Sequence, residues 1–157
     1  MQGEFIAFIS HDDLWLPGKL DKRTAFMRHN PNVLYTVAMV QPVLAPGSAV
    51  PLGFRSELLE RPVPGMLMET LVARKRVFAR VGGLDPQFAI AEDTDWFARA
   101  RDANIEMALL PDVLLHKRIH GANASLTELR LNQLLLHAMR RSVMRKKALA
   151  GGSGGAR

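Results

Sequence analysis

The sequence contains no cysteine and few aromatic residues. With no cysteine among 157 residues, disulfide bonds, zinc sites built from thiolates and cysteine nucleophiles are all excluded. Aromatic residues make up only 6% of the chain. They are not interleaved with the basic residues, as they are in proteins that stack nucleic-acid bases on aromatic rings. We therefore expect no nucleic-acid binding.

Long apolar runs and a leader segment are also lacking. No run approaches the roughly 20 apolar residues that a membrane-spanning helix needs, and the N-terminus shows no basic leader with a cleavage site. Charged residues make up 23% of the chain and the mean hydropathy is close to zero, which is typical of soluble globular domains. These features predict a cytoplasmic protein with one compact core.

The net charge of +6 is unevenly distributed along the chain. The rest of the sequence is nearly balanced, so the basic character belongs to the C-terminal segment rather than to the body of the domain. The basic residues that gather there are Arg130, Arg140, Arg141, Arg145, Lys146, Lys147 and Arg157.

The order of apolar and polar residues predicts an α/β fold in which strands alternate with helices. The proline-rich segment 42–64 predicts an irregular loop with a helical turn near Glu57, and segment 66–73 fits either a strand or a helix. The expected strands are 4–9, 33–43 and 106–115, the last interrupted at Pro111, and the expected helices are 17–29, 74–81 and 92–104.

The C-terminal segment predicts a long amphipathic helix. Ser125 to Glu128 has the form of a capping box, which would open a helix that runs to about Ala148. Such a helix most often packs on the sheet or on another subunit, but a basic amphipathic helix can also lie on anionic lipid. The glycine-rich segment 151–155 predicts a flexible end.

Carboxylates are concentrated in two clusters beside the ends of the expected elements. Asp12 and Asp13 follow the first strand, and Glu92, Asp93 and Asp95 open a helix. Magnesium and manganese prefer oxygen ligands, so two separate clusters favour a divalent cation together with a general base. Two simpler interpretations stay open, in which the first cluster caps the helix near residue 17 and the second complements a helix dipole.

A third polar segment, Arg118 to Ser125, lies between a strand and a helix. Strand alternation would put Arg118 and His120 on the same side. A guanidinium and an imidazole beside a helix N-terminus suit a phosphate. The alternative is a solvated loop with a capping serine.

Taken in order, these segments resemble the family 2 glycosyltransferases of the GT-A type. The resemblance covers about Gly3 to Ser125 and depends on four motifs: SHDD with LWLPGKL, RVFARVGGLD, AEDTDWFAR, and RIHGANAS. It implies a partial GT-A, Rossmann-like mixed sheet flanked by helices over residues 1–125, followed by the basic amphipathic helix at 126–149 and a flexible tail at 150–157.

The resemblance also implies roles for the carboxylates. Asp12 holds the last position of the DxD motif, where it would ligate the metal on the nucleotide diphosphate, with Asp13 as a supporting carboxylate. Asp93 of the ED motif would be the general base, with Glu92 beside it.

The remaining motifs would surround this centre. Arg118 and His120 would close over the diphosphate, and His120 would be a second metal contact. Gly83 and Asp85 would shape the acceptor side, and Trp96 would pack behind the base.

The function implied is transfer of a sugar from a nucleotide-diphosphate donor to a hydroxyl acceptor, by an inverting mechanism that needs Mn²⁺ or Mg²⁺. Ser10 stands where the family usually has aspartate, and most of the nucleotide-binding half is absent. A second copy or a partner chain would then supply that half, at the inner face of a membrane if the basic helix binds lipid. The alternatives are a catalytically inactive fragment or accessory binding module, and a metal-dependent phosphohydrolase.

Overall fold

The computed structural model of the chain describes residues 3–152 and shows an α/β fold around a curled mixed sheet. The strand order is β1-β5-β3-β6-β2, and β4 pairs with β3 outside this path. The central pair β3 and β6 is parallel, whereas every other pairing is antiparallel. The strands are β1 (Phe5–Ala7), β2 (Leu14–Trp15), β3 (Tyr35–Leu44), β4 (Val63–Pro64), β5 (Val72–Arg74) and β6 (Met107–Ile119).

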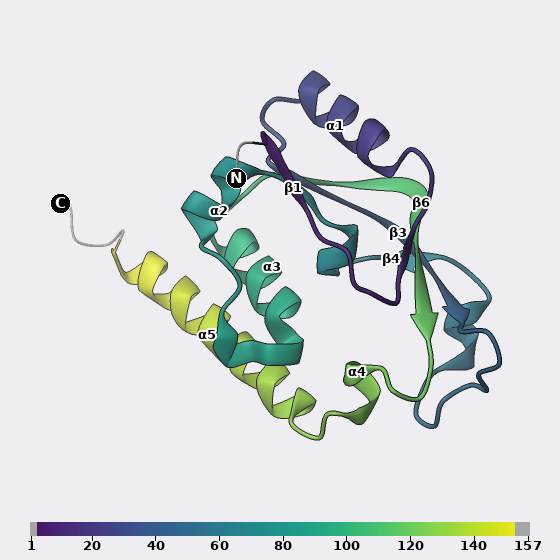
Figure 1. Cartoon of the computed structure of the whole chain (residues 1–157). Helices are drawn as coiled ribbons and strands as arrows, with labels where there is room; N and C mark the ends of the chain where they lie inside the picture. Colours follow the sequence, from purple (N-terminus) through teal and green to yellow (C-terminus); the bar gives the residue numbers. More distant parts are fainter. Residues whose placement is uncertain (1–2, 153–157) are drawn as a thin grey trace.

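Helices cover both faces of this sheet. Figure 1 shows α1 on one face, and α2, α3 and α5 on the other. The α-helices are α1 (Lys19–His29), α2 (Lys75–Val81), α3 (Glu92–Asp102), α4 (Ala124–Thr127) and α5 (Leu131–Gly152). The short 3₁₀ helices are η1 (Ser56–Leu59), η2 (Met68–Thr70) and η3 (Pro86–Ala91). The strands and helices expected before residue 105 are thus confirmed, and segment 66–73 divides into η2 and the start of β5.

The core has two parts because successive residues of a strand point to opposite faces. On the α1 face, Val72 packs against Met27 of α1. On the other face, Ala73 belongs to a cluster with Trp96 of α3. Tyr35 lies in the same cluster, with its ring centre 5.4 Å from that of Trp96 in an edge-to-face arrangement. The sheet is therefore buried on both sides. The positions of its strand ends then determine where the polar side chains that follow the strands lie.

The expected interruption at Pro111 is wrong. Strand β6 continues through this residue by means of a bulge: Ala38 pairs with Leu110, but Met39 pairs with Val113. Proline has no N–H to donate to a ladder, and a bulge is a position where that loss is tolerated. The strand therefore reaches Ile119 and carries Lys117 and Arg118 to the far end of the sheet.

The expected capping box is also wrong. The backbone of Glu128 has φ −82° and ψ 112°, which is extended, so α4 ends there and α5 begins at Leu131. The Glu128 carboxylate accepts from the N–H of Arg130 at 3.2 Å and so turns toward α5 instead of back toward Ser125. Helix α5 also includes Gly151 and Gly152, which the sequence assigned to a flexible end, while 153–157 lie outside the described residues.

Helix α5 packs on α3 and η3 and not on the sheet. Ala138 is buried against Phe88, and the buried Ser142 donates to Asp102 at 2.8 Å. The opposite side of the helix leaves Val143 and Met144 exposed. Within residues 3–152, no helix has both the length and the apolar character needed to cross a membrane.

Helix η3, which precedes α3, contains a strained residue. Ala89 has φ 33° and ψ −93°, a conformation that costs a residue with a Cβ about 1–3 kcal/mol. Ala89 is exposed, so its methyl group contributes little packing. We expect Ala89→Gly to raise the free energy of unfolding by about 1 kcal/mol in urea denaturation. The matched change Ala25→Gly, at an exposed position of helix α1, should lower it by about 1 kcal/mol, and stabilisation by both or by neither would contradict the strain.

Candidate functional site

Asp12 lies just after β1 and is held by two neighbours. The Ser10 hydroxyl donates to Asp12 Oδ1 at 2.8 Å, and His120 Nε2 lies 3.1 Å from Asp12 Oδ2. Partial burial acts to raise the pKa of Asp12, but these hydrogen bonds outweigh it and lower the pKa to about 2. Asp12 is therefore a carboxylate at neutral pH, and it does not cap α1, whose N-cap residue Gly18 has no side-chain cap.

His120 is oriented by the turn that follows β6. The N–H of Ala122 donates to His120 Nδ1 at 3.2 Å, so in the neutral ring the proton resides on Nε2 and is donated to Asp12. Asn123 supports the turn, because its Oδ1 accepts from the His120 N–H at 2.7 Å and its Nδ2 donates to the Arg118 carbonyl at 3.2 Å. The turn therefore directs the Nε2 atom of the imidazole toward Asp12.

Asp13 forms a buried ion pair with Lys117. The Lys117 ammonium lies 2.8 Å from Asp13 Oδ2 and 3.5 Å from Glu69 Oε1, and the N–H of Arg118 donates to Asp13 Oδ1 at 3.1 Å. The Asp13 side chain is fully buried. Burial acts to lower the pKa of Lys117, but the surrounding carboxylates raise it overall. Lys117 is thus a fixed cation between two acidic segments.

Glu69 belongs to η2, which α1 holds in place. The buried Lys19 of α1 donates to the Glu69 carbonyl, and its ammonium lies 4.0 Å from the centre of the Trp15 ring. Burial, together with the charge of Arg23, lowers the pKa of Lys19 to about 7. The position of Glu69 therefore depends on a contact between distant parts of the sequence.

Asp93 lies at the N-terminus of α3 and has a perturbed acidity. Burial raises its pKa to about 6, and the charges of Glu92 and Glu69 add to this effect. Hydrogen bonds from Thr94 act in the opposite direction, including one from the Thr94 N–H at 2.6 Å. Asp93 is therefore close enough to Glu69 to respond to its charge, and it can exchange a proton near neutral pH.

These contacts bring together three segments that are far apart in the sequence, and the charge of Glu69 acts on a fourth. We call the group the acidic site: it combines the loop after β1, helix η2, the first turn of α3 and the end of β6. It has four carboxylates, a lysine and a histidine, namely Asp12, Asp13, Glu69, Asp93, Lys117 and His120.

The remaining residues of the ED motif differ in their surroundings. Glu92 is half-buried, and its Oε2 atom is buried with no hydrogen-bond partner in residues 3–152. Asp95 accepts from Arg99 at 2.7 Å, one turn along α3, and serves the helix. Trp96 is fully buried, and its indole N–H donates to the Gly82 carbonyl at 3.1 Å, so this ring fixes the turn between α2 and η3 against α3.

The predicted acceptor-side residues Gly83 and Asp85 belong to that turn. The Gly83 carbonyl accepts from Arg99 at 2.8 Å. Asp85 accepts from the N–H of Gln87 at 3.0 Å and from Arg141 of α5 at 2.9 Å. Both residues therefore hold the turn to its neighbouring helices.

Arg118 contributes to the acidic site through its backbone, and its side chain is exposed. Strand β6 carries Lys117 toward Asp13, and the Arg118 carbonyl accepts from Asn123. The guanidinium makes no hydrogen bond within residues 3–152.

Asp12 and His120 fit a divalent cation only as a pair. Within residues 3–152, no group of three or more histidine and acidic side chains is arranged to hold a metal, and both oxygens of Asp13 are occupied by Lys117 and the Arg118 N–H. Magnesium often takes only one or two protein ligands, with phosphate oxygens and water completing its shell. Two protein donors would leave most of a cation's shell to other ligands, and His120 would have to lose its Nε2 proton on ligation.

Sequence reasoning missed Lys117, Glu69 and Asn123. Strand alternation offered a signal for Lys117, which must point opposite to Arg118 if β6 continues to Ile119. Glu69 carried no signal, because its segment fitted two kinds of structure and its role depends on a contact with α1.

No model of a known protein family matches this chain, and no curated protein matches it.

Proposed function

We propose that the chain is the catalytic portion of a GT-A type glycosyltransferase that resembles family 2. It would transfer a sugar from a nucleotide-diphosphate donor to a hydroxyl acceptor. The observation that carries this proposal is that the DxD-like and RIH segments meet through hydrogen bonds, while Asp93 of the ED segment responds to the charge of the neighbouring Glu69. These segments are about 80 and 105 residues apart along the chain, so neither the composition nor the local sequence pattern requires them to lie close together.

The chemistry of each side chain supports the assigned role. Asp93, with a pKa of about 6, is ionised above that pH and can accept the proton of an acceptor hydroxyl. The oxygen would then attack the anomeric carbon as the bond to the diphosphate breaks. Asp93 would hold the proton, and the nucleoside diphosphate would leave with the bonding electrons.

The leaving diphosphate needs positive charge, and three groups are available for it. Lys117 provides a partly buried cation that is paired with Asp13, and the exposed Arg118 lies at the same end of β6. Asp12 and His120 would hold Mn²⁺ or Mg²⁺, which supplies Lewis-acid stabilisation of the departing charge. Asp12 suits this role because its pKa of about 2 keeps it ionised.

Donor binding can be tested by thermal unfolding. We expect uridine, guanosine or thymidine diphosphate sugars to raise Tm in the presence of Mn²⁺, since a ligand that binds only the folded state stabilises it. Asp12→Asn should abolish the Mn²⁺-dependent part of the shift. Asp21→Asn makes the same chemical change at an exposed position on α1 and should leave the shift intact; absence of any shift with wild-type protein, or an equal shift in Asp12→Asn, would contradict the proposal.

A further inference from the structure

A pocket lies between α3, α5 and the starts of β3 and β6. Its volume is about 820 Å³, within the range of pockets that bind small molecules. None of the six residues of the acidic site lines it. It is therefore a separate feature, and we call it the α3–α5 pocket.

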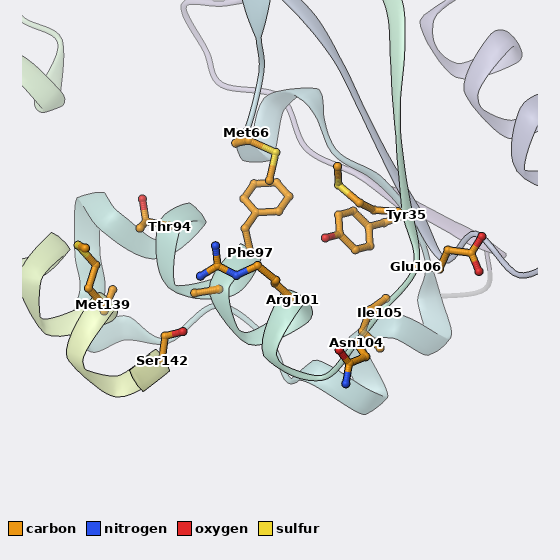
Figure 2. Close-up of a pocket in the computed structure, with 13 residues that line it drawn as sticks. Tyr35, Met66, Thr94, Phe97, Arg101, Asn104, Ile105, Glu106, Met139 and Ser142 are labelled. Atoms are coloured by element: carbon orange, nitrogen blue, oxygen red, sulfur yellow. The ribbon is translucent and has the colours of Figure 1, made fainter. Parts of the chain in front are cut away.

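Most of its wall is apolar. Figure 2 shows Phe97 and Met66 on one side and Met139 of α5 on the other. Ile105 and Met107 also line the pocket. Methionine side chains adapt to different apolar shapes, so this lining suits a flexible aliphatic body better than a rigid polar one.

A buried hydroxyl reaches this pocket. Tyr35 is 2% exposed, and its ring is fixed between Trp96 and Phe97. Its hydroxyl makes no hydrogen bond within residues 3–152, and Figure 2 shows it on the pocket side of the ring. Burial raises the pKa of Tyr35, so the hydroxyl stays protonated and can donate a hydrogen bond to a ligand in the pocket.

Arg101 brings a positive charge to the same pocket. Arg101 of α3 lines the pocket, and its charge acts on the ionisation of Tyr35. The guanidinium makes no hydrogen bond or ion pair within residues 3–152, and Figure 2 shows it turned into the space between Phe97 and α5. Glu106, an acidic residue of the lining, points away from that space in the same view. Arg101 is exposed, and a guanidinium and a hydroxyl that line one pocket can both donate to an anionic oxygen.

We propose that the α3–α5 pocket binds an amphipathic anion with a single aliphatic chain, whose acid group pairs with Arg101 and Tyr35 while its chain lies among Phe97, Met66 and Met139. This site does not depend on sugar transfer. Its occupancy would also place a ligand between α3, which carries Asp93, and α5.

Calorimetric titration with decanoate tests the site. Wild-type protein is expected to bind decanoate. Arg101→Gln should weaken binding at least about tenfold, because it removes a charged hydrogen-bond donor, and Tyr35→Phe about fivefold, because it removes one hydroxyl and keeps the ring. The uncharged decanol should bind at least about tenfold more weakly than decanoate.

Two controls keep the result specific. Lys147→Gln removes a positive charge from an exposed position of α5 outside the pocket and should leave decanoate affinity unchanged. Circular dichroism would verify that each variant is folded. Absence of decanoate binding, equal binding by folded Arg101→Gln, or equal losses in Lys147→Gln and Arg101→Gln would overturn the proposal.

Discussion

Replacing Asp93 with asparagine is expected to stabilise the fold at pH 8 by about 3 kcal/mol. The pKa of Asp93 is about 6 in the folded chain and about 3.9 in an unfolded chain. The folded state therefore binds the proton more tightly, so stability falls as the pH rises from about 4 to about 6. Above pH 6 the ionised carboxylate imposes a constant cost, which the neutral amide of asparagine removes.

The measurement is urea denaturation of both proteins at pH 4 and pH 8. The two curves should lie close together at pH 4, where Asp93 is protonated in the folded chain and about half protonated in the unfolded chain, and should separate at pH 8. Asp85→Asn is the matched control, since hydrogen bonds from Gln87 and Arg141 lower the pKa of Asp85, and its loss should destabilise the fold at pH 8. Destabilisation by Asp93→Asn at pH 8 would show that the carboxylate is a structural group and would remove it as a base.

Replacing Lys117 with methionine is expected to destabilise the fold by about 3 kcal/mol. The Asp13 side chain is fully buried, and Lys117 is its charged partner at 2.8 Å. Without the ammonium, Asp13 would retain only the Arg118 N–H and would stay buried with an uncompensated charge. Methionine preserves the length of the side chain, so loss of packing contributes little.

A double-mutant cycle separates this electrostatic cost from other effects. Adding Asp13→Asn to Lys117→Met should recover most of the lost stability in urea denaturation, because the buried charge is then gone. Lys22→Met breaks an exposed pair with Asp112 and should cost less than about 1 kcal/mol. Equal losses for the Lys117 and Lys22 variants, or no recovery in the double variant, would contradict a buried ion pair at the centre of the acidic site.

The sequence predicted local elements well wherever a short-range signal decides the structure. Gly82, with φ 88°, ends α2 as a glycine after an apolar helix should, and α1 ends at His29, just before Asn30-Pro31. Prediction failed where a tertiary contact overrides the local signal. Pro111 was taken as a strand break, but pairing with β3 absorbs it in a bulge.

In the acidic site too, some residues carry a local sequence signal and others depend on tertiary contacts. Asp12, Asp93 and His120 could be identified because they stand at the ends of elements within motifs. The partner of Asp13 could not, because Lys117 lies 104 residues away and only the sheet order brings β6 beside β2. Perturbed acidity is likewise absent from the sequence, since it depends on the burial of Asp93 and on the nearby charges of Glu92 and Glu69 in the folded chain.

The most direct test of the central claim is release of nucleoside diphosphate from a panel of nucleotide sugars, with Mn²⁺ and hydroxyl acceptors, followed across pH 5 to 8. Wild-type protein should release the diphosphate faster as the pH rises through about 6, where Asp93 ionises. Asp93→Asn should show no such release although it still binds the donor. Release by Asp93→Asn at the wild-type rate, or donor binding by wild-type protein with no release under any condition, would contradict the assignment of Asp93 as the base of a glycosyltransferase.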